Sequence, residues 1–555
     1  MTKNIRFSNL DRKKTIAKLK GETFDLVVIG GGITGGGIAL DAASRGLKVA
    51  LVEKNDFASG TSSKSTKLIH GGLRYLKQFD FWLVKEVGSE RAIVHNLAPH
   101  LVLPEKMLLP LIENGSYGKW LTSIGLKVYD ILAQVTGDDK RKMLEKKEAL
   151  KLEPLLPKKI LKGAGYYAEY RTDDSRLTME TIKTILQYGA MPLNYAEVTD
   201  FIYEEDLVAG VKVRDTVLDT EFPIKAKYVI SAAGPWVDEL RGINNSKKGK
   251  RLHLTKGVHL VFPYEKLPIK QSVYFDIPDG RMMFAIPRGK ITYIGTTDTN
   301  FNENKDSVRT DVADAIYLIS AVNNMFPKIN LEMEDIISSW AGLRPLIHEE
   351  GKSASELSRK DEIFTSDTGL ISIAGGKLTG YRKMAERVVN RVAKKMEEDY
   401  GISVKDSDTE HIPLCGNDFK KYKYVKKYIA EIHERLTPEG FSHYDAWYLV
   451  TNYGKQTETI LQYYAKQKED DHVLGMAKAE LKFTIEHEMV QTPMDFFIRR
   501  TGRLYFDIDS IRNLMEPILA EFKTIYKLDD EVINSYRKTL EREMDEHSNF
   551  SLDRI

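Results

Sequence analysis

FDLVVIGGGITGGGIALDAASRGLKVALVE, residues 24–53, is the stretch that decides the fold of this chain. An apolar run ends in a turn that carries Gly30, Gly32 and Gly35. A segment of small residues follows, and a second apolar run closes on Glu53. This order predicts a strand, a helix and a second parallel strand, which together form the βαβ unit of a Rossmann-type nucleotide-binding domain.

Each glycine of this turn has a predicted task. Gly30 permits the tight turn with its neighbour Gly31, Gly32 lets the backbone approach a pyrophosphate, and Gly35 lets helix and strand pack closely. The N-terminus of the helix then offers unpaired N–H groups to phosphates. Glu53 is placed to accept hydrogen bonds from a ribose, which favours a free 2′-hydroxyl and disfavours NADP. The pattern by itself does not separate NAD from FAD, and a purely structural glycine turn is the alternative.

Composition narrows the class of protein. A chain of 555 residues is too long for one core, so two or three domains are expected. A formal net charge of +2 provides no overall field that would attract nucleic acid. The single cysteine, Cys415, excludes an internal disulfide framework and argues against iron–sulfur and thiolate–zinc sites. No metal site is expected from the scattered histidines His411, His472 and His487.

The chain has no apolar run near the roughly 18 residues needed to span a bilayer. Residues 1–20 are basic but lack the apolar centre of a secretory signal. These features predict a cytoplasmic protein whose contact with a membrane, if it has one, is peripheral.

Further along the chain, other segments point to the same nucleotide domain. A strand-like run ends in SAAGPW, which contains Gly234, and GLISIAGGK, with Gly375 and Gly376, leads directly into a helical pattern. Residues 250–300 alternate apolar and polar positions between turn signals, as an antiparallel sheet does. Beyond residue 410 the pattern becomes helical.

We therefore expect an α/β fold with an α+β insertion. Its parts are a discontinuous Rossmann-type FAD-binding domain, an antiparallel-sheet substrate or cap domain and an all-helical C-terminal domain. Their predicted limits are 20–100, 165–240 and 335–400 for the first, 100–165 and 240–335 for the second, and 405–555 for the third. An inserted sheet suits a flavoenzyme, which must cover the face of its isoalloxazine ring, better than a nicotinamide dehydrogenase.

Eight segments of the chain resemble a known family. They are IGGGITGGGIALDAASRG, TSSKSTKLIHGGLRYL, AAGPW, KGVHLV, IGTTDT, AGLRPL, AGGKLTGYR and HEMVQTPMDFFIRRTGRL, in this order along nearly the whole chain. The first is common to flavoproteins, whereas the LIHGGLRYL and GGKLT segments are more specific. The chain resembles FAD-dependent glycerol-3-phosphate dehydrogenase, the respiratory enzyme of the D-amino-acid-oxidase-like flavoprotein superfamily.

The resemblance implies that sn-glycerol 3-phosphate is oxidised at C2 to dihydroxyacetone phosphate, with FAD as the hydride acceptor. Such a reaction needs cations that hold a phosphate dianion, and guanidinium matches phosphate oxygens well. By similarity to the family, Arg74, Arg344 and Lys377 contact the substrate phosphate or the flavin edge, with Tyr75 beside them. The alternative for any one arginine is an ordinary ion pair.

A base must also take the proton of the substrate hydroxyl, and histidine suits this task near neutral pH. His259 in KGVHLV is the favoured residue, although a histidine on an apolar strand is often simply part of the core. His70 and Lys256 remain the alternatives, and Lys256 is also a candidate for contact with the substrate.

The remaining predicted site residues surround the cofactor. By similarity, the stretch with Thr61, Ser62 and Ser63 touches the adenosine ribose or the pyrophosphate, next to Glu53 and Lys54. A hydroxyl turn that caps a helix is the alternative reading. Lys377, Leu378 and Thr379 would offer backbone N–H groups to the flavin O2 region.

The acceptor of the electrons is the least determined part of the prediction. The dehydrogenases of this family deliver electrons to membrane quinone. One enzymatic alternative is a glycerol-3-phosphate oxidase that uses oxygen as the acceptor. Another is an enzyme that oxidises a different hydroxy or amino acid. A non-catalytic FAD-binding or RNA-associated protein is the alternative of another class, and no nucleic acid is expected as a partner. Residues 117–129 and 420–427 are candidate membrane-docking stretches. Core packing is the alternative for the first stretch, and an ordinary solvated helix face is the favoured alternative for the second. A second copy of the same chain, in a homodimer, is a further candidate partner.

Overall fold

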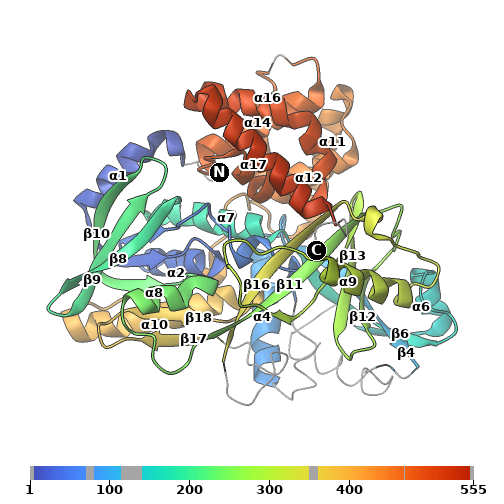
Figure 1. The fold of residues 1–555 in the computed structure, drawn as a ribbon, viewed down its shortest axis with the longest axis horizontal. Helices are drawn as coiled ribbons and strands as arrows, with labels where there is room; N and C mark the ends of the chain where they lie inside the picture. Colours follow the sequence, from blue (N-terminus) through green and yellow to red (C-terminus); the bar gives the residue numbers. More distant parts are fainter. Residues whose placement is uncertain are drawn as a thin grey trace.

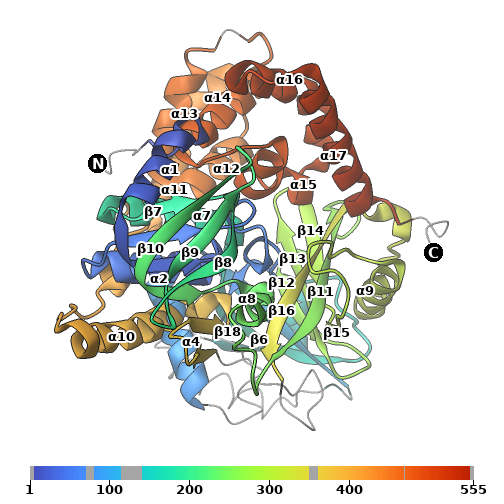
Figure 2. The same cartoon turned by 60° about the vertical axis from the view of Figure 1, so that its left-hand side comes forward.

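The computed structural model describes residues 6–70, 81–113, 115, 141–348, 361–467 and 469–550. Within these ranges the strands form two large sheets that lie side by side, and helices of the C-terminal part lie over both of them (Figures 1 and 2). The structure therefore confirms the predicted fold class.

The first sheet contains the βαβ unit. Its strands run in the order β17, β18, β10, β1, β2, β7, with β9 paired to β10 and β8 paired to β9. The pairs among β18, β10, β1, β2 and β7 are parallel, as a Rossmann-type core requires. The bounds are β1 Thr23–Ile29, β2 Val49–Val52, β7 Met191–Leu193, β8 Ala196–Glu204, β9 Leu207–Asp215, β10 Thr220–Ser231, β17 Glu362–Thr365 and β18 Ile371–Ala374.

Helices cover this sheet and bury its strands. Strands β1, β2 and β18 are almost continuously apolar, as expected for strands covered on both faces. Their side chains share one core with those of α2 (Ile33–Ser44), α7 (Asp174–Ile185) and α10 (Tyr381–Tyr400). The helix α1 (Arg12–Gly21) precedes the first strand, and the 3-10 turns η1 (Asn9–Asp11) and η4 (Leu186–Tyr188) lie at helix ends.

The second sheet is mostly antiparallel. Its order is β15, β11, β14, β13, β12, β4, β6, β3, with β16 paired to β11 and β5 paired to β6. The bounds are β3 Leu68–Ile69, β4 Leu103–Ile112, β5 Lys142–Glu145, β6 Leu161–Arg171, β11 Leu252–Pro263, β12 Ser272–Asp276, β13 Met282–Arg288, β14 Ile291–Gly295, β15 Thr299–Asn300 and β16 Ser338–Ile347. Helices near its edges and ends are α4 Phe81–Leu97, α6 Lys146–Leu152, α8 Val237–Ile243 and α9 Val312–Met325.

The strand pairing differs from the predicted domain limits in two places. Strand β16 pairs with β11 along its whole length, whereas the prediction places residues 335–400 in the FAD-binding domain. Strand β6 pairs with β4 from Leu161 to Arg171, whereas the predicted limit between the two domains lies at residue 165. The alternation of apolar residues identifies a strand but carries no information on its partner, so these limits required the tertiary pairing.

The C-terminal part of the chain is helical. Its helices are α11 Tyr422–Leu436, α12 His443–Tyr453, α13 Thr457–Tyr464, α14 His472–His487, α15 Arg503–Phe506, α16 Ile508–Tyr526 and α17 Asp530–Ser548, with the π-helix η11 at Asp495–Arg500. Shorter turns are η8 Thr409–His411, η9 Thr437–Glu439 and η10 Gly454–Gln456. Phe496, Tyr505 and Ile508 share a core with Val261 and Trp340 of the second sheet. The helices are therefore joined to the rest of the molecule by a common core.

Candidate functional site

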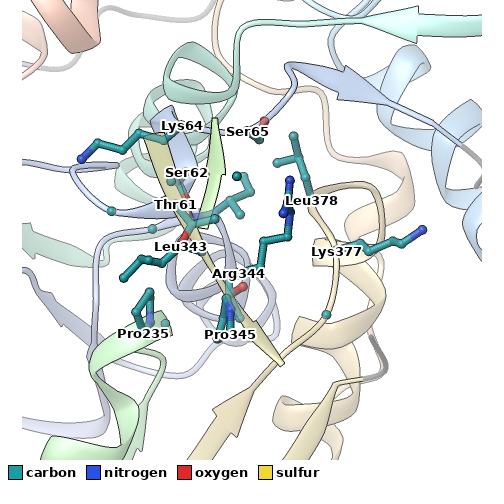
Figure 3. Close-up of a pocket in the computed structure, with 18 of the residues that line it drawn as sticks. Thr61, Ser62, Lys64, Ser65, Pro235, Leu343, Arg344, Pro345, Lys377 and Leu378 are labelled. Carbon is teal, nitrogen blue, oxygen red and sulfur yellow. Dashed lines mark hydrogen bonds between the residues drawn. The ribbon is translucent and has the colours of Figure 1, made fainter. Parts of the chain in front are cut away.

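A cavity of about 700 Å³ lies between the two sheets. Its walls come from the glycine turn after β1, from β11 and β16, and from three short 3-10 turns: η2 Thr61–Ser63, η5 Gly234–Trp236 and η7 Leu378–Gly380. Figure 3 shows Arg344 between Thr61 and Ser62 on one side and Leu378 and Lys377 on the other. Segments more than 300 residues apart in the sequence thus form one site.

The glycine turn has the geometry that its sequence predicts. Gly30 has a φ of +115°, and a Cβ there would lie 2.5 Å from the carbonyl oxygen of Ala232. A Cβ at Gly35 would overlap the carbonyl oxygen of Gly30. At Gly32 it would lie 3.0 Å from Ser62 Oγ. Gly30 and Gly32 line the cavity, whereas Gly35 lies behind the turn and allows its close packing.

Glu53 closes the same end of the cavity. Its Oε2 accepts a hydrogen bond from the backbone N–H of Gly31 at 2.7 Å, and its Oε1 accepts one from Asn55 at 2.9 Å. Burial raises the pKa of this carboxyl above its usual value. Gly31 does not itself line the cavity, but it orients the carboxylate. A carboxylate oxygen has a second lone pair, so Glu53 can still accept a hydrogen bond from a ribose hydroxyl.

The hydroxyl residues after Glu53 hold the protein's own elements together. Ser62 Oγ accepts the N–H of Ile33 at 2.9 Å, at the start of α2, and Thr61 donates to the carbonyl oxygen of Leu343 at 2.7 Å. Both line the cavity, whereas Ser63 is buried and does not. The cap on α2 is the alternative that the sequence left open, and it is compatible with a cofactor nearby.

A lysine and an aromatic ring flank the Glu53 end. Lys54 lines the cavity, and its ammonium lies 4.5 Å from the centre of the Trp236 ring and 2.8 Å from Asp306 Oδ1. Gly234 opens η5 beside this ring with a φ of +52°. The turn SAAGPW therefore approaches the same cavity as the first glycine turn.

The segment after β18 forms the opposite wall. Gly375 and Gly376 have φ values of +79° and +89°, and a Cβ at Gly376 would overlap the side chain of Met384. Lys377 and Leu378 line the cavity, and Figure 3 shows the Lys377 side chain extending away from Arg344. This places the backbone of the segment, rather than the lysine ammonium, nearest the centre of the site.

Thr379 connects this wall to His70. The Thr379 hydroxyl lies 3.2 Å from both the backbone N–H and the carbonyl oxygen of His70. The His70 imidazole lines the cavity and lies edge-on to the Phe284 ring, with centroids 6.0 Å apart. His70 thus belongs to the site.

Arg344 on β16 has a guanidinium that is fixed by the segment after β14. Its Nη1 donates to the carbonyl oxygen of Thr297 at 2.9 Å and to Asp298 Oδ1 at 3.1 Å, and Nη2 donates to Thr296 Oγ1 at 2.7 Å. Gly257 on β11 leaves the space for it, because a Cβ there would overlap the guanidinium. The cation is thus held against the cavity wall before any ligand arrives.

His259 on β11 is buried, with 1% of its surface exposed, yet it lines the cavity. Its ring stacks on that of Trp340 with centroids 4.8 Å apart, and its Nε2 lies 3.0 Å from Thr66 Oγ1. Its Nδ1 has no hydrogen-bond partner among the residues described. Burial, with Arg344 and Lys67 nearby, holds the pKa of His259 well below its usual value. The imidazole is therefore neutral near pH 7.

Of three further predicted residues, Lys256 is not brought to the site, and the other two are not among the described residues. The ammonium of Lys256 lies 2.7 Å from Asp311 Oδ2 and 2.6 Å from Asp314 Oδ2, and Lys256 does not line the cavity. Its side chain joins β11 to α9, so neither predicted role for it is supported. Arg74 and Tyr75 lie outside the described residues.

Several residues of the site were missed from the sequence. Thr66 and Asp174 line the cavity, and Lys67 is buried beneath it with its ammonium 2.5 Å from Asp174 Oδ1. Arg281 lines the cavity from the turn before β13. The turn signal Pro-Asp-Gly was visible in the sequence, but which arginine it presents to the cavity depends on strand pairing.

The residues fit a dinucleotide. One end of the cavity has the glycine turn, the start of α2 and Glu53, which suit pyrophosphate and ribose, and the other has His259 and Arg344. The antiparallel sheet covers the far end. A Rossmann-type domain whose nucleotide cavity is covered by an inserted sheet is the arrangement expected of a flavoprotein oxidoreductase.

Two family models match the chain. The model of FAD dependent oxidoreductases matches residues 25–382, and the model of the C-terminal domain of alpha-glycerophosphate oxidase matches residues 407–533. The chain belongs to the family of FAD-dependent glycerol-3-phosphate dehydrogenases, and its cofactor is FAD. The predicted family and cofactor are thereby confirmed.

Relatives match over nearly the full length. The aerobic glycerol-3-phosphate dehydrogenase of Bacillus subtilis is 48% identical over 97% of this chain and 98% of its own. That of Staphylococcus saprophyticus is 46% identical over 98% of both chains. The solved structure of the glycerol-3-phosphate dehydrogenase from Bacillus halodurans complexed with FAD has a TM-score of 0.83 at 42% identity, over 98% of both chains.

Proposed function

We propose that this chain oxidises sn-glycerol 3-phosphate at C2 to dihydroxyacetone phosphate and passes the electrons to a membrane quinone. The observation that supports this most directly is one cavity that joins a dinucleotide turn to a fixed guanidinium and a neutral imidazole. When bound, FAD supplies the hydride acceptor, which no side chain can replace.

Arg344 binds the phosphate group in this proposal. Its guanidinium is planar and pre-oriented by Thr296, Thr297 and Asp298, so little conformational entropy is lost when a dianion arrives. The segment of Lys377 to Thr379 offers backbone groups to the flavin, whereas the Lys377 side chain extends away from Arg344. Arg74 and Tyr75 keep their proposed contacts by family resemblance alone.

His259 takes the proton of the C2 hydroxyl. A general base must be unprotonated and must lie beside the reacting group, and the buried neutral imidazole meets the first condition. Trp340 and Thr66 fix the plane of its ring, so a substrate held by Arg344 meets it in one orientation. His70, at the opposite wall, is the remaining alternative, because Lys256 is engaged elsewhere.

The quinone acceptor requires a face that meets the bilayer. No helix in the described part of the chain is long and apolar enough to cross a membrane. Residues 420–427 include the start of α11, where Tyr424 is 44% exposed and lysine ammonium groups lie near the tyrosine rings. A basic, tyrosine-bearing surface attracts anionic headgroups. Residues 117–129, the other proposed docking stretch, lie outside the described residues.

Anaerobic addition of sn-glycerol 3-phosphate to the purified holoenzyme tests the proposal. We expect loss of the absorbance of oxidised flavin, and rapid recovery on addition of a soluble quinone but slow recovery in oxygen. Recovery that is as fast in oxygen, with hydrogen peroxide formed, would support the oxidase. A flavin that no phosphorylated or unphosphorylated small alcohol bleaches would contradict the enzymatic function.

A further inference from the structure

Arg344 carries one positive charge, which is shared with Asp298 and does not by itself balance a phosphate dianion. A guanidinium has five N–H groups, and both of those on Nη1 are engaged by Thr297 and Asp298. One on Nη2 is engaged by Thr296. A dianion that enters the cavity would therefore gain from cations in addition to Arg344.

A second arginine lines the same cavity from the turn before another strand. Arg281 follows the turn at Pro278 to Gly280 and directly precedes β13. Phe284 of β13 pairs with Gly295, the last residue of β14, so the segment before β13 and the segment after β14 leave the sheet at the same end. Asp298, which binds Arg344, also interacts electrostatically with Arg281. The two arginines thus lie at the same end of the sheet.

Arg281 is held in place by its surroundings. Its Nε and Nη2 donate to Asp279 Oδ2 at 2.8 and 2.6 Å, and its guanidinium lies 4.6 Å from the centre of the Tyr317 ring. The Tyr317 hydroxyl donates to the same carboxylate oxygen at 2.8 Å. Nη1 of Arg281 makes no hydrogen bond within the part of the chain that the structure describes. The side chain is thus oriented at the cavity wall and keeps donors for a ligand.

We propose that Arg281 is a further phosphate-binding arginine, beyond those that the family resemblance implies, and that it holds the phosphate group of the substrate together with Arg344. This inference rests on the proposed function of the site. Arg281 would give the enzyme its preference for a phosphorylated over an unphosphorylated alcohol, because only a dianion gains from two guanidinium groups.

The test compares Arg281→Gln with wild-type holoenzyme by anaerobic flavin reduction over a range of sn-glycerol 3-phosphate concentrations. Loss of a charge-assisted hydrogen bond should raise the apparent Kd for the substrate roughly 10- to 100-fold. The limiting rate of flavin reduction and the FAD content should change little, because Arg281 touches neither the reacting carbon nor the flavin-binding turn. Inorganic phosphate, as a competitor, should lose affinity by a similar factor.

Two variants serve as controls. Arg214→Gln removes an exposed arginine that pairs with Asp219 at 2.9 Å on the β9–β10 hairpin, away from the cavity, and should leave the substrate Kd unchanged. Arg281→Lys keeps a cation but loses the paired N–H groups of the planar guanidinium, so its Kd should fall between those of wild type and Arg281→Gln. If Arg281→Gln fails to retain flavin, the substrate Kd of Arg281→Lys tests whether Arg281 binds the phosphate.

The outcomes separate the two proposals. If the substrate bleaches wild-type flavin but both Arg281 variants keep the wild-type Kd within twofold, the role of Arg281 is wrong and the proposed function stands. If the substrate does not bleach wild-type flavin at all, the proposed function itself is wrong.

Discussion

At the scale of single residues, the site depends on an imidazole kept neutral by burial. His259 is packed between Trp340 and Gly295, where a Cβ would overlap the ring. The Thr66 hydroxyl lies 3.0 Å from its Nε2 and holds the ring by a hydrogen bond. The energetic cost of burying a charge, rather than a carboxylate partner, sets its protonation state.

Replacing His259 by Ala should slow flavin reduction by about two to four orders of magnitude, the usual contribution of a general base, with FAD still bound. Thr66→Val, which removes the hydroxyl but keeps the shape, should slow it by a smaller factor, whereas Thr66→Ser should approach wild type. Stopped-flow flavin reduction at saturating substrate measures all three. A wild-type rate in His259→Ala would transfer the role to His70.

The lowered pKa of His259 also predicts a pH dependence. A histidine with an ordinary pKa of about 6.5 would be half protonated near that pH and unable to act as base. Because burial, Arg344 and Lys67 lower the pKa of His259, the neutral form persists below it. The limiting rate of flavin reduction should therefore stay flat from about pH 8 to about pH 6. A rate that halves near pH 6.5 would show that the base is an exposed histidine.

The same pKa affects stability. Between the unfolded pKa and the lower folded pKa, the unfolded chain binds more protons than the folded one at this position. The contribution of His259 to the free energy of unfolding is thus fully present when the pH lies above the pKa of His259 in the unfolded chain. This contribution is lost as the pH falls from that pKa towards the lower pKa of the folded state.

At the scale of elements, the position of Arg344 depends on a glycine in the neighbouring strand. Gly257 of β11 pairs with Gly342 of β16, and its missing side chain provides the space for the guanidinium. Strand pairing therefore determines the substrate site as directly as the arginine does.

Gly257→Ala should displace the guanidinium and raise the apparent Kd for sn-glycerol 3-phosphate by about tenfold or more, since the hydrogen bonds it makes to charged groups would be misaligned. The FAD content should remain normal, because Gly257 lies on the substrate side of the cavity. Gly242→Ala in α8 is the matched control: a Cβ there meets nothing within 4 Å, so binding should be unchanged. Equal effects of the two variants would contradict the assignment.

At the scale of the whole molecule, the C-terminal helices hold the loop that follows Glu53. Asp56 is fully buried and accepts hydrogen bonds from Arg499 Nε at 2.6 Å and from Arg500 Nη1 and Nη2 at 2.8 and 2.9 Å. These two arginines outweigh the effect of burial and lower the pKa of Asp56 to about 2. The cofactor end of the cavity is thus tied to a segment more than 440 residues away.

Asp56→Asn should destabilise the protein strongly, by about 3–5 kcal/mol, because it breaks the buried ion pairs that Asp56 makes with Arg499 and Arg500 and leaves these two charges only partly compensated by Asp495 and Glu488. It should also weaken FAD retention, since Glu53 and Asn55 lie in the same loop. Thermal unfolding and the release of flavin fluorescence on heating measure both effects. Asp219→Asn, in an exposed pair, should leave both midpoints unchanged. If Asp56→Asn released its flavin at the same temperature as the wild type, the proposed connection between Asp56 and FAD retention would be wrong.

Local sequence alone determined the glycine turn, the strand–helix–strand unit, Glu53, the second glycine pair at Gly375 and Gly376 and the helical C-terminus. These features depend on contacts between near neighbours and on backbone conformations that only certain residues adopt. Only tertiary structure decided that β16 belongs to the second sheet, that Lys256 pairs with aspartates of α9, and that Arg281 faces the cavity. Strand partners and ion-pair partners are chosen by packing between distant segments, which no local pattern encodes.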